Sequence, residues 1–272
     1  MGSRLVLVAL VTFCINLLGA IAGDMIGSVF ESKPVKSKNF TLFSPGSSYT
    51  DDSVLTLAVA SALLTGSDYA SIFRAYYRQH PDRGYGAGFR RWVDSPETCP
   101  CYSYGNGSAM RAGPIGWAFN SLDEVLAEAK TCAVVTHNHA DGIKGAQAVA
   151  AAVYLARHGS TKPAIRSYIT SSFNYDLDRT LNGIRPGYTF TTNCEGSVPE
   201  AILAFLESSG FEDAVRNAIS LGGDSDTMAC IAGAIAEAYY KEPDPDIHCV
   251  VFARLPENLA RTALHFNSRF CN

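Results

Sequence analysis

The sequence lacks the features that hold small or metal-stapled proteins together. Its eight cysteines contain no C-x-x-C pair and no histidine at zinc-finger spacing, which disfavours a zinc site. A chain of 272 residues buries a sizeable core without disulfides, so we expect reduced thiols. Only 18% of the residues are charged and the net charge is −4, so we expect no nucleic-acid partner.

The chain also lacks the alternation of apolar and polar residues that is typical of strands. Nearly every periodic segment repeats its apolar residues at helical spacing, and no linker divides the chain. We therefore predict a single-domain, all-α protein. In such a bundle, loops and helix N-termini can converge on one face.

The predicted helices alternate with three irregular regions. Helices are expected at residues 18–30, 53–64, 69–79, 122–135, 143–157, 211–221, 228–240 and 256–265, with two more that start at Pro163 and Ser197. Residues 33–48, 84–107 and 173–195 are rich in polar, glycine or aromatic residues and are predicted to be loops.

The N-terminal stretch allows two interpretations. Residues 5–23 are uncharged and include Ala20-Ile21-Ala22, which is typical of a signal-peptide cleavage site. Cleavage there would cut directly before Gly23-Asp24, which we assign to the folded domain. We therefore favour an apolar extension at residues 1–17, a domain at residues 18–272 and a cytoplasmic protein. A secreted or membrane-anchored protein, with residues 1–22 as the anchor, is the alternative.

Two acidic clusters stand directly before apolar helical runs. Thr50-Asp51-Asp52-Ser53 precedes one run, and Asp224-Ser225-Asp226-Thr227 follows a Gly-Gly turn and precedes another. One acid is enough to cap a helix, so the surplus suggests a further role. Carboxylate and hydroxyl oxygens suit Mg, Mn or Ca, and the D-x-D-x-D-G pattern of a calcium loop is absent. The sequence therefore predicts a metal site assembled from two distant segments.

Other polar residues are candidates for the same site. Asp24 and Glu31 are seven residues apart, which places them on nearly the same face if one helix continues through both. A buried carboxylate needs a donor or a metal, whereas Glu31 could also be a solvated helix end. Glycines near Asn106 could form an anion-binding nest or a plain surface turn. His137 and His139 could bind a ligand, or could simply hydrogen-bond at a helix junction.

Taken together, these motifs resemble those of the ADP-ribosylglycohydrolase family. The resemblance covers about residues 18–240. It rests on Gly19-Ala20-Ile21-Ala22-Gly23-Asp24 with Gly27 and Glu31, Thr50-Asp51-Asp52, Gly105-Asn106-Gly107-Ser108-Ala109-Met110-Arg111, Thr136-His137, and Gly222-Gly223-Asp224-Ser225-Asp226-Thr227. It implies an orthogonal helical bundle with a binuclear metal cleft, and hydrolysis of the glycosidic bond between ADP-ribose and an acceptor.

The resemblance also implies roles for individual residues. Matched to the family, the ligands of two Mg²⁺ or Mn²⁺ ions are Thr50, Asp51, Asp52, Asp224, Asp226 and Thr227. The positions that contact ADP-ribose are Asn106, Gly107, Ser108, Met110 and His137. Either Glu31 or Asp52 would be the catalytic acid/base. The implied partner is an ADP-ribosylated protein or small molecule, linked through arginine, serine or another acceptor.

The chemistry can be stated in physical terms. Two cations would hold the ribose hydroxyls while a carboxylate activates water and the leaving group is protonated, through an oxocarbenium-like transition state. The alternative is a catalytically inactive ADP-ribose-binding or structural protein on the same scaffold. Loss of metal ligands would be the mark of such a protein, and no ligand position is missing here.

Overall fold

The structure is a computed structural model that describes residues 17–95, 101–241 and 245–271. Within these ranges it consists of α-helices, one 3₁₀ turn and connecting loops, with no strand beyond an isolated bridge between Gly105 and Asn193. The all-α prediction is confirmed. None of the described helices is both long enough and apolar enough to cross a membrane. Residues 1–16, which make up nearly all of the predicted extension, lie outside the described residues.

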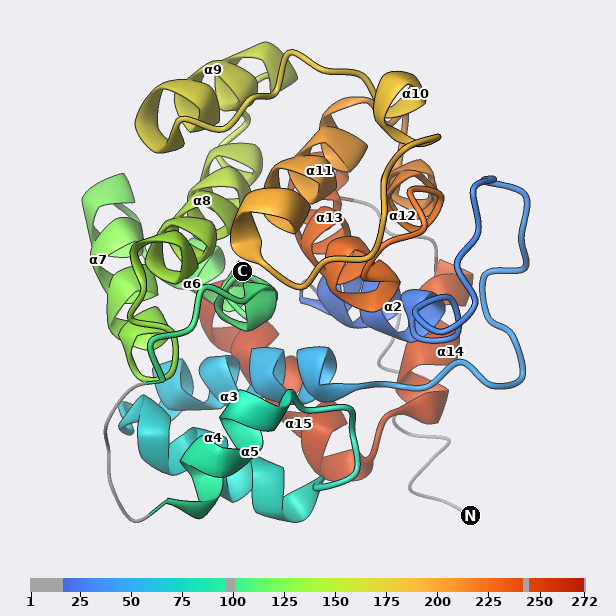
Figure 1. Cartoon of the computed structure of the whole chain (residues 1–272). Coiled ribbons are helices and arrows are strands. Elements are labelled where there is room, and N and C mark those ends of the chain that lie inside the picture. The colour runs from blue at the N-terminus through green and yellow to red at the C-terminus, as the bar shows by residue number, and fades with distance from the viewer. Residues whose placement is uncertain (1–16, 96–100, 242–244, 272) are drawn as a thin grey trace.

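Figure 1 shows the arrangement of the helices. In chain order they are α2 (Leu18–Gly27), α3 (Asp51–Thr65), α4 (Tyr69–Gln79), α5 (Ala87–Asp94), the 3₁₀ turn η1 (Asn106–Ser108), α6 (Gly113–Ala118), α7 (Leu122–Val134), α8 (Ala140–Arg157), α9 (Lys162–Phe173), α10 (Leu181–Ile184), α11 (Cys194–Leu206), α12 (Phe211–Ile219), α13 (Ser225–Tyr240), α14 (Pro245–Arg254) and α15 (Glu257–Phe270).

Helix α13 is the centre of the bundle. All of its residues are buried except the last two, Tyr239 and Tyr240, because α2, α8, α11 and α12 pack around it. Between its polar first turn and Glu237 its sequence is apolar on every side, as expected of a helix without a solvent-facing stripe. Cys132, Cys194 and Cys230 are buried free thiols, in line with the expectation of reduced cysteines.

Helices α2 and α13 approach each other at the distance that glycine allows. A Cβ atom on Gly23 would lie 2.0 Å from the carbonyl oxygen of Ala229, and one on Gly233 would lie 2.2 Å from that of Gly19. Glu237 of α13 completes the contact, because its carboxylate accepts hydrogen bonds from the backbone N–H groups of Leu17 (2.7 Å) and Gly19 (2.9 Å). The Glu237 side chain therefore acts as an N-cap for α2.

Several helices begin earlier than their apolar periodicity predicts. Helix α3 starts at Asp51 instead of residue 53, α8 at Ala140 instead of 143, and α13 at Ser225 instead of 228. The first turn of each is polar, so it carries no apolar signal. Helix α11 starts at Cys194, and its cap is Asn193, whose side chain accepts from the N–H of Gly196 at 2.7 Å. The prediction that this helix starts at Ser197 was wrong.

Four short helices were not predicted: α5, α6, α10 and α14. They lie in regions rich in glycine, proline or polar residues, where tertiary contacts decide the conformation; Ile115 and Trp117 of α6, for example, are buried. The first predicted helix is also shorter than expected. Because α2 ends at Gly27, Glu31 does not share a helix face with Asp24 but lies in the turn that follows.

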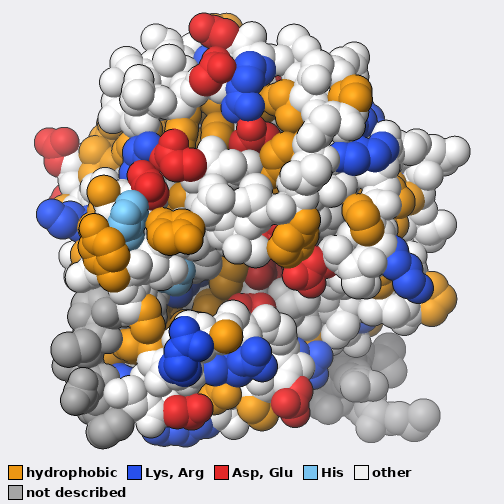
Figure 2. All heavy atoms as spheres, in the orientation of Figure 1, with side chains coloured by type: hydrophobic (Ala, Val, Ile, Leu, Met, Phe, Trp, Pro, Cys, Tyr) orange, Lys and Arg blue, Asp and Glu red, His pale blue; other side chains and the backbone are white. Residues whose placement is uncertain are grey.

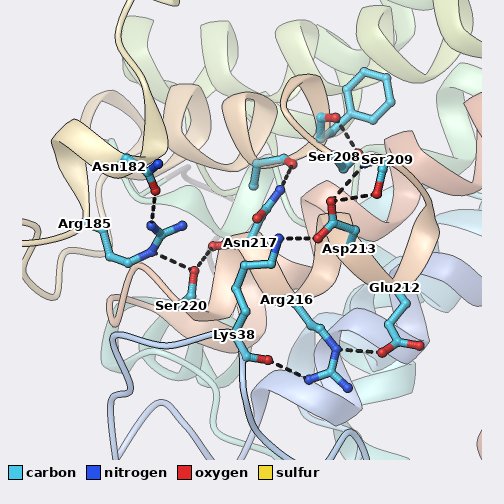
Figure 3. A network of polar contacts seen from close by, with 12 residues as sticks. Lys38, Asn182, Arg185, Ser208, Ser209, Glu212, Asp213, Arg216, Asn217 and Ser220 are labelled. Carbon is cyan, nitrogen blue, oxygen red and sulfur yellow. Dashed lines mark hydrogen bonds and ion pairs between the residues drawn. The ribbon is translucent and has the colours of Figure 1, made fainter.

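The loop at residues 33–48 is irregular, as predicted, and is tied to α12. Figure 3 shows the ion pair between Lys38 and Asp213, and Arg216, which donates to the carbonyl oxygen of Lys38 at 2.8 Å. From the other side, Arg185 donates to Ser220 Oγ at 3.0 Å. These contacts hold α12 from its first turn to Ser220, just before the Gly-Gly turn that leads to α13.

Because α2 and α13 pack so closely, one methyl group added at their contact should strongly lower the stability of the fold. We expect Gly23→Ala to lower the free energy of unfolding by at least about 2 kcal/mol, because the new Cβ collides with backbone. Gly88→Ala is the matched control, since Gly88 is also helical and nothing lies within 4 Å of its added Cβ. Urea unfolding of both variants measures the difference; equal stabilities would contradict the close packing.

Candidate active site

The two acidic clusters occupy the N-termini of α3 and α13. Thr50 is the N-cap of α3, and its Oγ1 accepts from the N–H of Asp52 at 3.2 Å. Asp224 holds the N-cap position of α13 but makes no side-chain capping bond. Instead its carboxylate accepts from Asn106 Nδ2 at 2.8 Å. The acids of α13 therefore are not there merely to cap the helix.

Asp24 fixes the position of the first cluster. Its side chain is completely buried on α2. It accepts hydrogen bonds from Thr50 Oγ1 (2.6 Å), Thr50 N (2.9 Å), Ser53 N (3.1 Å) and Ser53 Oγ. Because donors already satisfy both of its oxygens, Asp24 holds the start of α3 against α2 and is not itself needed as a ligand.

A cavity of about 290 Å³ lies where these helix ends meet. The predicted residues that line it are Glu31, Thr50, Asp51, Asp52, Asn106, Gly107, Met110, His137, Asp224, Asp226 and Thr227. Figure 2 shows acidic side chains within the hollow at the centre of this face. Ser108 is the exception among the predicted site residues, since it is buried behind the cavity wall and donates to the carbonyl oxygen of Gly142 at 2.7 Å.

The carboxylates of this cavity have the character of a cation site. Glu31, Asp224 and Asp226 each place an oxygen within 4.8 Å of the other two. Asp52 is 3% exposed, and its Oδ1 is buried without a hydrogen-bond partner among the described residues. An unsatisfied buried carboxylate oxygen is costly, and a divalent cation would remove that cost. The residues present therefore fit the predicted Mg²⁺ or Mn²⁺.

Burial and mutual repulsion raise the pKa values of these acids. Burial, followed by the charge of Asp24, raises the pKa of Asp51 to about 8 and that of Asp52 well above its usual range. Burial and the charge of Asp52 do the same to the pKa of Asp226. Partial burial of the Glu31 carboxyl group, followed by the charge of Asp224, raises its pKa. None of these acids forms an ion pair with a basic side chain among the described residues, although the charge of Asp51 acts on Arg111.

Next to the acids, a second wall of the cavity presents polar groups on a glycine-rich turn. Asn106 is held by its N–H, which donates to Thr192 O at 2.8 Å, and by its side-chain bond to Asp224. His137 Nδ1 is 2.7 Å from Thr136 Oγ1. Burial and the nearby charge of Arg111 lower the pKa of His137 to about 3, so this histidine is neutral. His139 does not line the cavity and instead accepts from Asp141 N at 3.1 Å, as a helix cap.

Some residues that line the cavity were not among the site residues predicted from the sequence. Gly84, Gly86, Gly88 and Phe89 line it from the start of α5, in a region predicted to be a plain loop. The glycines at alternate positions were the available signal, because they leave the backbone open to a ligand. Arg111 also lines the cavity, and it was noticed only as part of a motif.

The raised pKa values predict how pH affects the metal-free protein. A carboxyl whose pKa is higher in the folded than in the unfolded state stabilises the fold at low pH, and this stability is lost as pH rises toward the folded pKa. For Asp51 the window runs from about pH 4 to about pH 8. We expect the melting temperature in a chelator to fall across this window.

Added Mg²⁺ or Mn²⁺ should reverse that loss, since it supplies a counter-charge. Thermal unfolding at pH 5 and pH 8, with chelator or with metal, measures both effects. Burial raises the pKa of Glu237 to about 8, and this residue lies outside the cavity. It therefore adds its own decrease of the melting temperature with pH, which metal does not change. Glu237→Gln separates the two contributions. A melting temperature at pH 8 that is insensitive to both ions would contradict the cation site.

The chain is similar in sequence to proteins of one kind. It matches the ADP-ribosylglycohydrolase family over residues 15–247. ADP-ribosylhydrolase ARH3 of Bos taurus is 31% identical over 305 residues, with 82% of this chain and 83% of that protein covered. ADP-ribosylarginine hydrolase Tri1 of Pseudomonas putida is 27% identical, with 82% of this chain and 69% of that protein covered.

A solved structure is similar in fold. It is described as an ADP-ribosylglycohydrolase-related protein complex, is 23% identical in sequence, and superposes with a TM-score of 0.71 over 93% of this chain and 95% of its own. This likeness shows a common helical architecture. Since the family match spans most of the chain and a 31% identical relative covers 82% of it, the chain belongs to the ADP-ribosylglycohydrolase family.

Proposed function

We propose that this protein is a metal-dependent hydrolase that cleaves the glycosidic bond between ADP-ribose and an acceptor, and so reverses ADP-ribosylation. One observation carries the proposal: carboxylates from three segments and the polar wall at Asn106 and His137 line the same cavity. Membership of the family supports it, as do the names of the relatives, which are hydrolases of ADP-ribosyl linkages.

The proposed metal ligands are oxygens at the starts of two helices: Thr50, Asp51, Asp52, Asp224, Asp226 and Thr227. Two divalent cations bound there would bind the ribose hydroxyls and stabilise negative charge that develops during the reaction. The like charges of the ligands are held together by the fold, since Asp24 anchors one cluster and the Gly-Gly turn delivers the other. Binding of cations is therefore favoured by a site that is assembled in advance.

Among the two candidates for proton transfer, we propose Glu31. Its side chain is exposed and borders the cavity, so its carboxylate can reach a water molecule or a leaving group. Asp52 is buried among Asp24, Asp51 and Asp224, a position that suits a ligand better than a base. The raised pKa of Glu31 also moves it toward the range in which a carboxyl can both accept and donate a proton.

The substrate would lie along the cavity wall formed by the glycine-rich turn and His137. We assign Asn106, Gly107, Met110 and His137 to contacts with ADP-ribose, because all four border the cavity. Ser108 does not border it, so we assign this residue to holding the glycine turn through its bond to Gly142. Phe89, a partly exposed residue of α5, adds an apolar surface to the cavity lining.

Release of ADP-ribose is the direct test of this function. We expect turnover of an ADP-ribosylated substrate with Mg²⁺ or Mn²⁺ and none in chelator. A panel of arginine-linked, serine-linked and small ADP-ribosylated substrates identifies the acceptor. Binding of ADP-ribose without turnover of any substrate, under either metal, would support the inactive binding protein instead.

Asp226→Asn tests the metal site. We expect metal affinity and activity to fall together, by at least about tenfold, because the substitution removes a full charge from the cluster. Asp226 lies inside the first turn of α13 and is not its N-cap, so the substitution removes no cap, and the metal-free protein should be no less stable because one repulsive charge is gone. Asp123→Asn is the matched control, since Asp123 is an exposed acid in the first turn of α7. Calorimetric titration and an assay at saturating metal check both; unchanged affinity would exclude Asp226 as a ligand.

A further inference from the structure

Arg111 is a buried charge beside the cavity, and Asp51 is the acid whose charge acts on it. Its side chain is 0% exposed, and none of the ion pairs among the described residues includes it. The guanidinium lies over the ring of Phe73, 4.3 Å from its centroid. Its Nη2 donates to Thr136 Oγ1 at 2.8 Å and to Cys132 O at 3.4 Å, whereas Nε and Nη1 are buried without partners. Burying such a charge is costly, so its position calls for an explanation.

Direct contact of Arg111 with a ligand does not provide that explanation. Although the residue borders the cavity, the two nitrogens that have no partner are inaccessible to solvent. The nitrogen that does form hydrogen bonds points to Thr136. Arg111 therefore acts on the cavity through Thr136, which is itself 1% exposed.

The hydrogen bonds of the Thr136 hydroxyl group determine which ring nitrogen of His137 carries the proton. A guanidinium only donates, so Thr136 Oγ1 accepts from Arg111. The hydroxyl has one proton of its own to donate, and the remaining hydrogen-bond partner in the described structure is His137 Nδ1, at 2.7 Å. If Nδ1 carried a proton, the buried hydroxyl proton would have no acceptor. Nδ1 is therefore the acceptor, and the proton of the neutral ring is on Nε2.

Nε2 faces the glycine-rich turn of the cavity. A Cβ atom on Gly107 would lie 3.2 Å from Nε2, and one on Gly105 would lie 3.6 Å away. No hydrogen bond within the described residues uses this nitrogen, and His137 borders the cavity. The absence of side chains at both glycines leaves the Nε2–H free to meet an oxygen atom of a ligand.

We propose that Arg111 is a positioning residue that acts through Thr136 to hold His137 as the neutral Nε2–H tautomer, which donates a hydrogen bond to an oxygen of the ADP-ribosyl ligand. The identity of the ligand rests on the proposed function, whereas the tautomer does not. A donor whose tautomer is set before binding needs no rearrangement when the ligand arrives. The lowered pKa of His137 agrees with a neutral ring.

The tautomer can be measured in the unaltered, metal-free chain. Long-range ¹H–¹⁵N correlation spectra at pH 7 distinguish a protonated ring nitrogen from a bare one, and the signals that disappear in His137→Gln identify this residue. We expect a bare Nδ1 and a protonated Nε2. A proton on Nδ1, on both nitrogens, or averaged between them would overturn the proposal.

Two variants of Thr136 test the relay. Thr136→Val removes the hydroxyl at nearly the same volume, and we expect loss of the single tautomer and at least about tenfold weaker binding of ADP-ribose in calorimetry. Thr136→Ser keeps the hydroxyl, and we expect the same tautomer with affinity within about twofold of the parent. A Val variant with an unchanged tautomer would overturn the relay. If the Val variant does not fold, the parent and Ser spectra still decide the tautomer.

Gly107→Ala tests the donor from the ligand side. Its new Cβ would cover Nε2 at 3.2 Å, so we expect weaker ADP-ribose binding with an unchanged tautomer. Unchanged affinity would overturn the role of Nε2–H as a ligand contact. A parent chain with the expected tautomer that binds no ADP-ribose would contradict the proposed function and the ligand part of this inference. A parent that hydrolyses ADP-ribosyl substrates with a proton on Nδ1 would overturn the relay alone.

Discussion

The buried carboxylate of Asp24 is the contact on which the site depends. It receives hydrogen bonds from the backbone and side chains of Thr50 and Ser53, and so joins α2 to the first turn of α3. Helix α2 is in turn pressed against α13 through glycines and capped by Glu237. Through this one path the two acidic clusters, which are about 170 residues apart in the sequence, are brought to the same cavity.

The same arrangement brings the carboxylates of the two clusters close together in the cavity, where water solvates their charges poorly. Asp51, Asp52 and Asp226 would each ionise more readily if they were apart, and their raised pKa values express that conflict. The fold withstands the conflict because these acids stand in the first turns of α3 and α13, two helices that pack against α2. A site that is unfavourable when empty, and that carries an unsatisfied oxygen on Asp52, is suited to a divalent cation. The resemblance noticed in the sequence is confirmed by the family match and agrees with this arrangement.

The cavity has two walls of different character. One wall consists of carboxylates with raised pKa values, and the other contains uncharged side chains whose orientation is fixed by hydrogen bonds to neighbouring residues. His137 belongs to the second wall, since burial and Arg111 hold its pKa at about 3. A neutral histidine beside the acidic cluster adds no charge to it. This division suits a ligand with both a sugar end and a polar, charged end.

The sequence by itself determined the helical class, the long helices and the residues of the acidic clusters. Apolar periodicity and surplus acids are local signals, and both are visible without knowledge of the fold. The short helices α5, α6, α10 and α14 were decided only by the tertiary structure, because their residues have weak local preferences and fold through their contacts. The tertiary structure also decided that Glu31 lies in an exposed turn, that Ser108 is buried behind the cavity wall, and that hydrogen bonds satisfy both oxygens of Asp24. Each depends on which donors another segment brings within reach, and that distance exists only once the helices have packed.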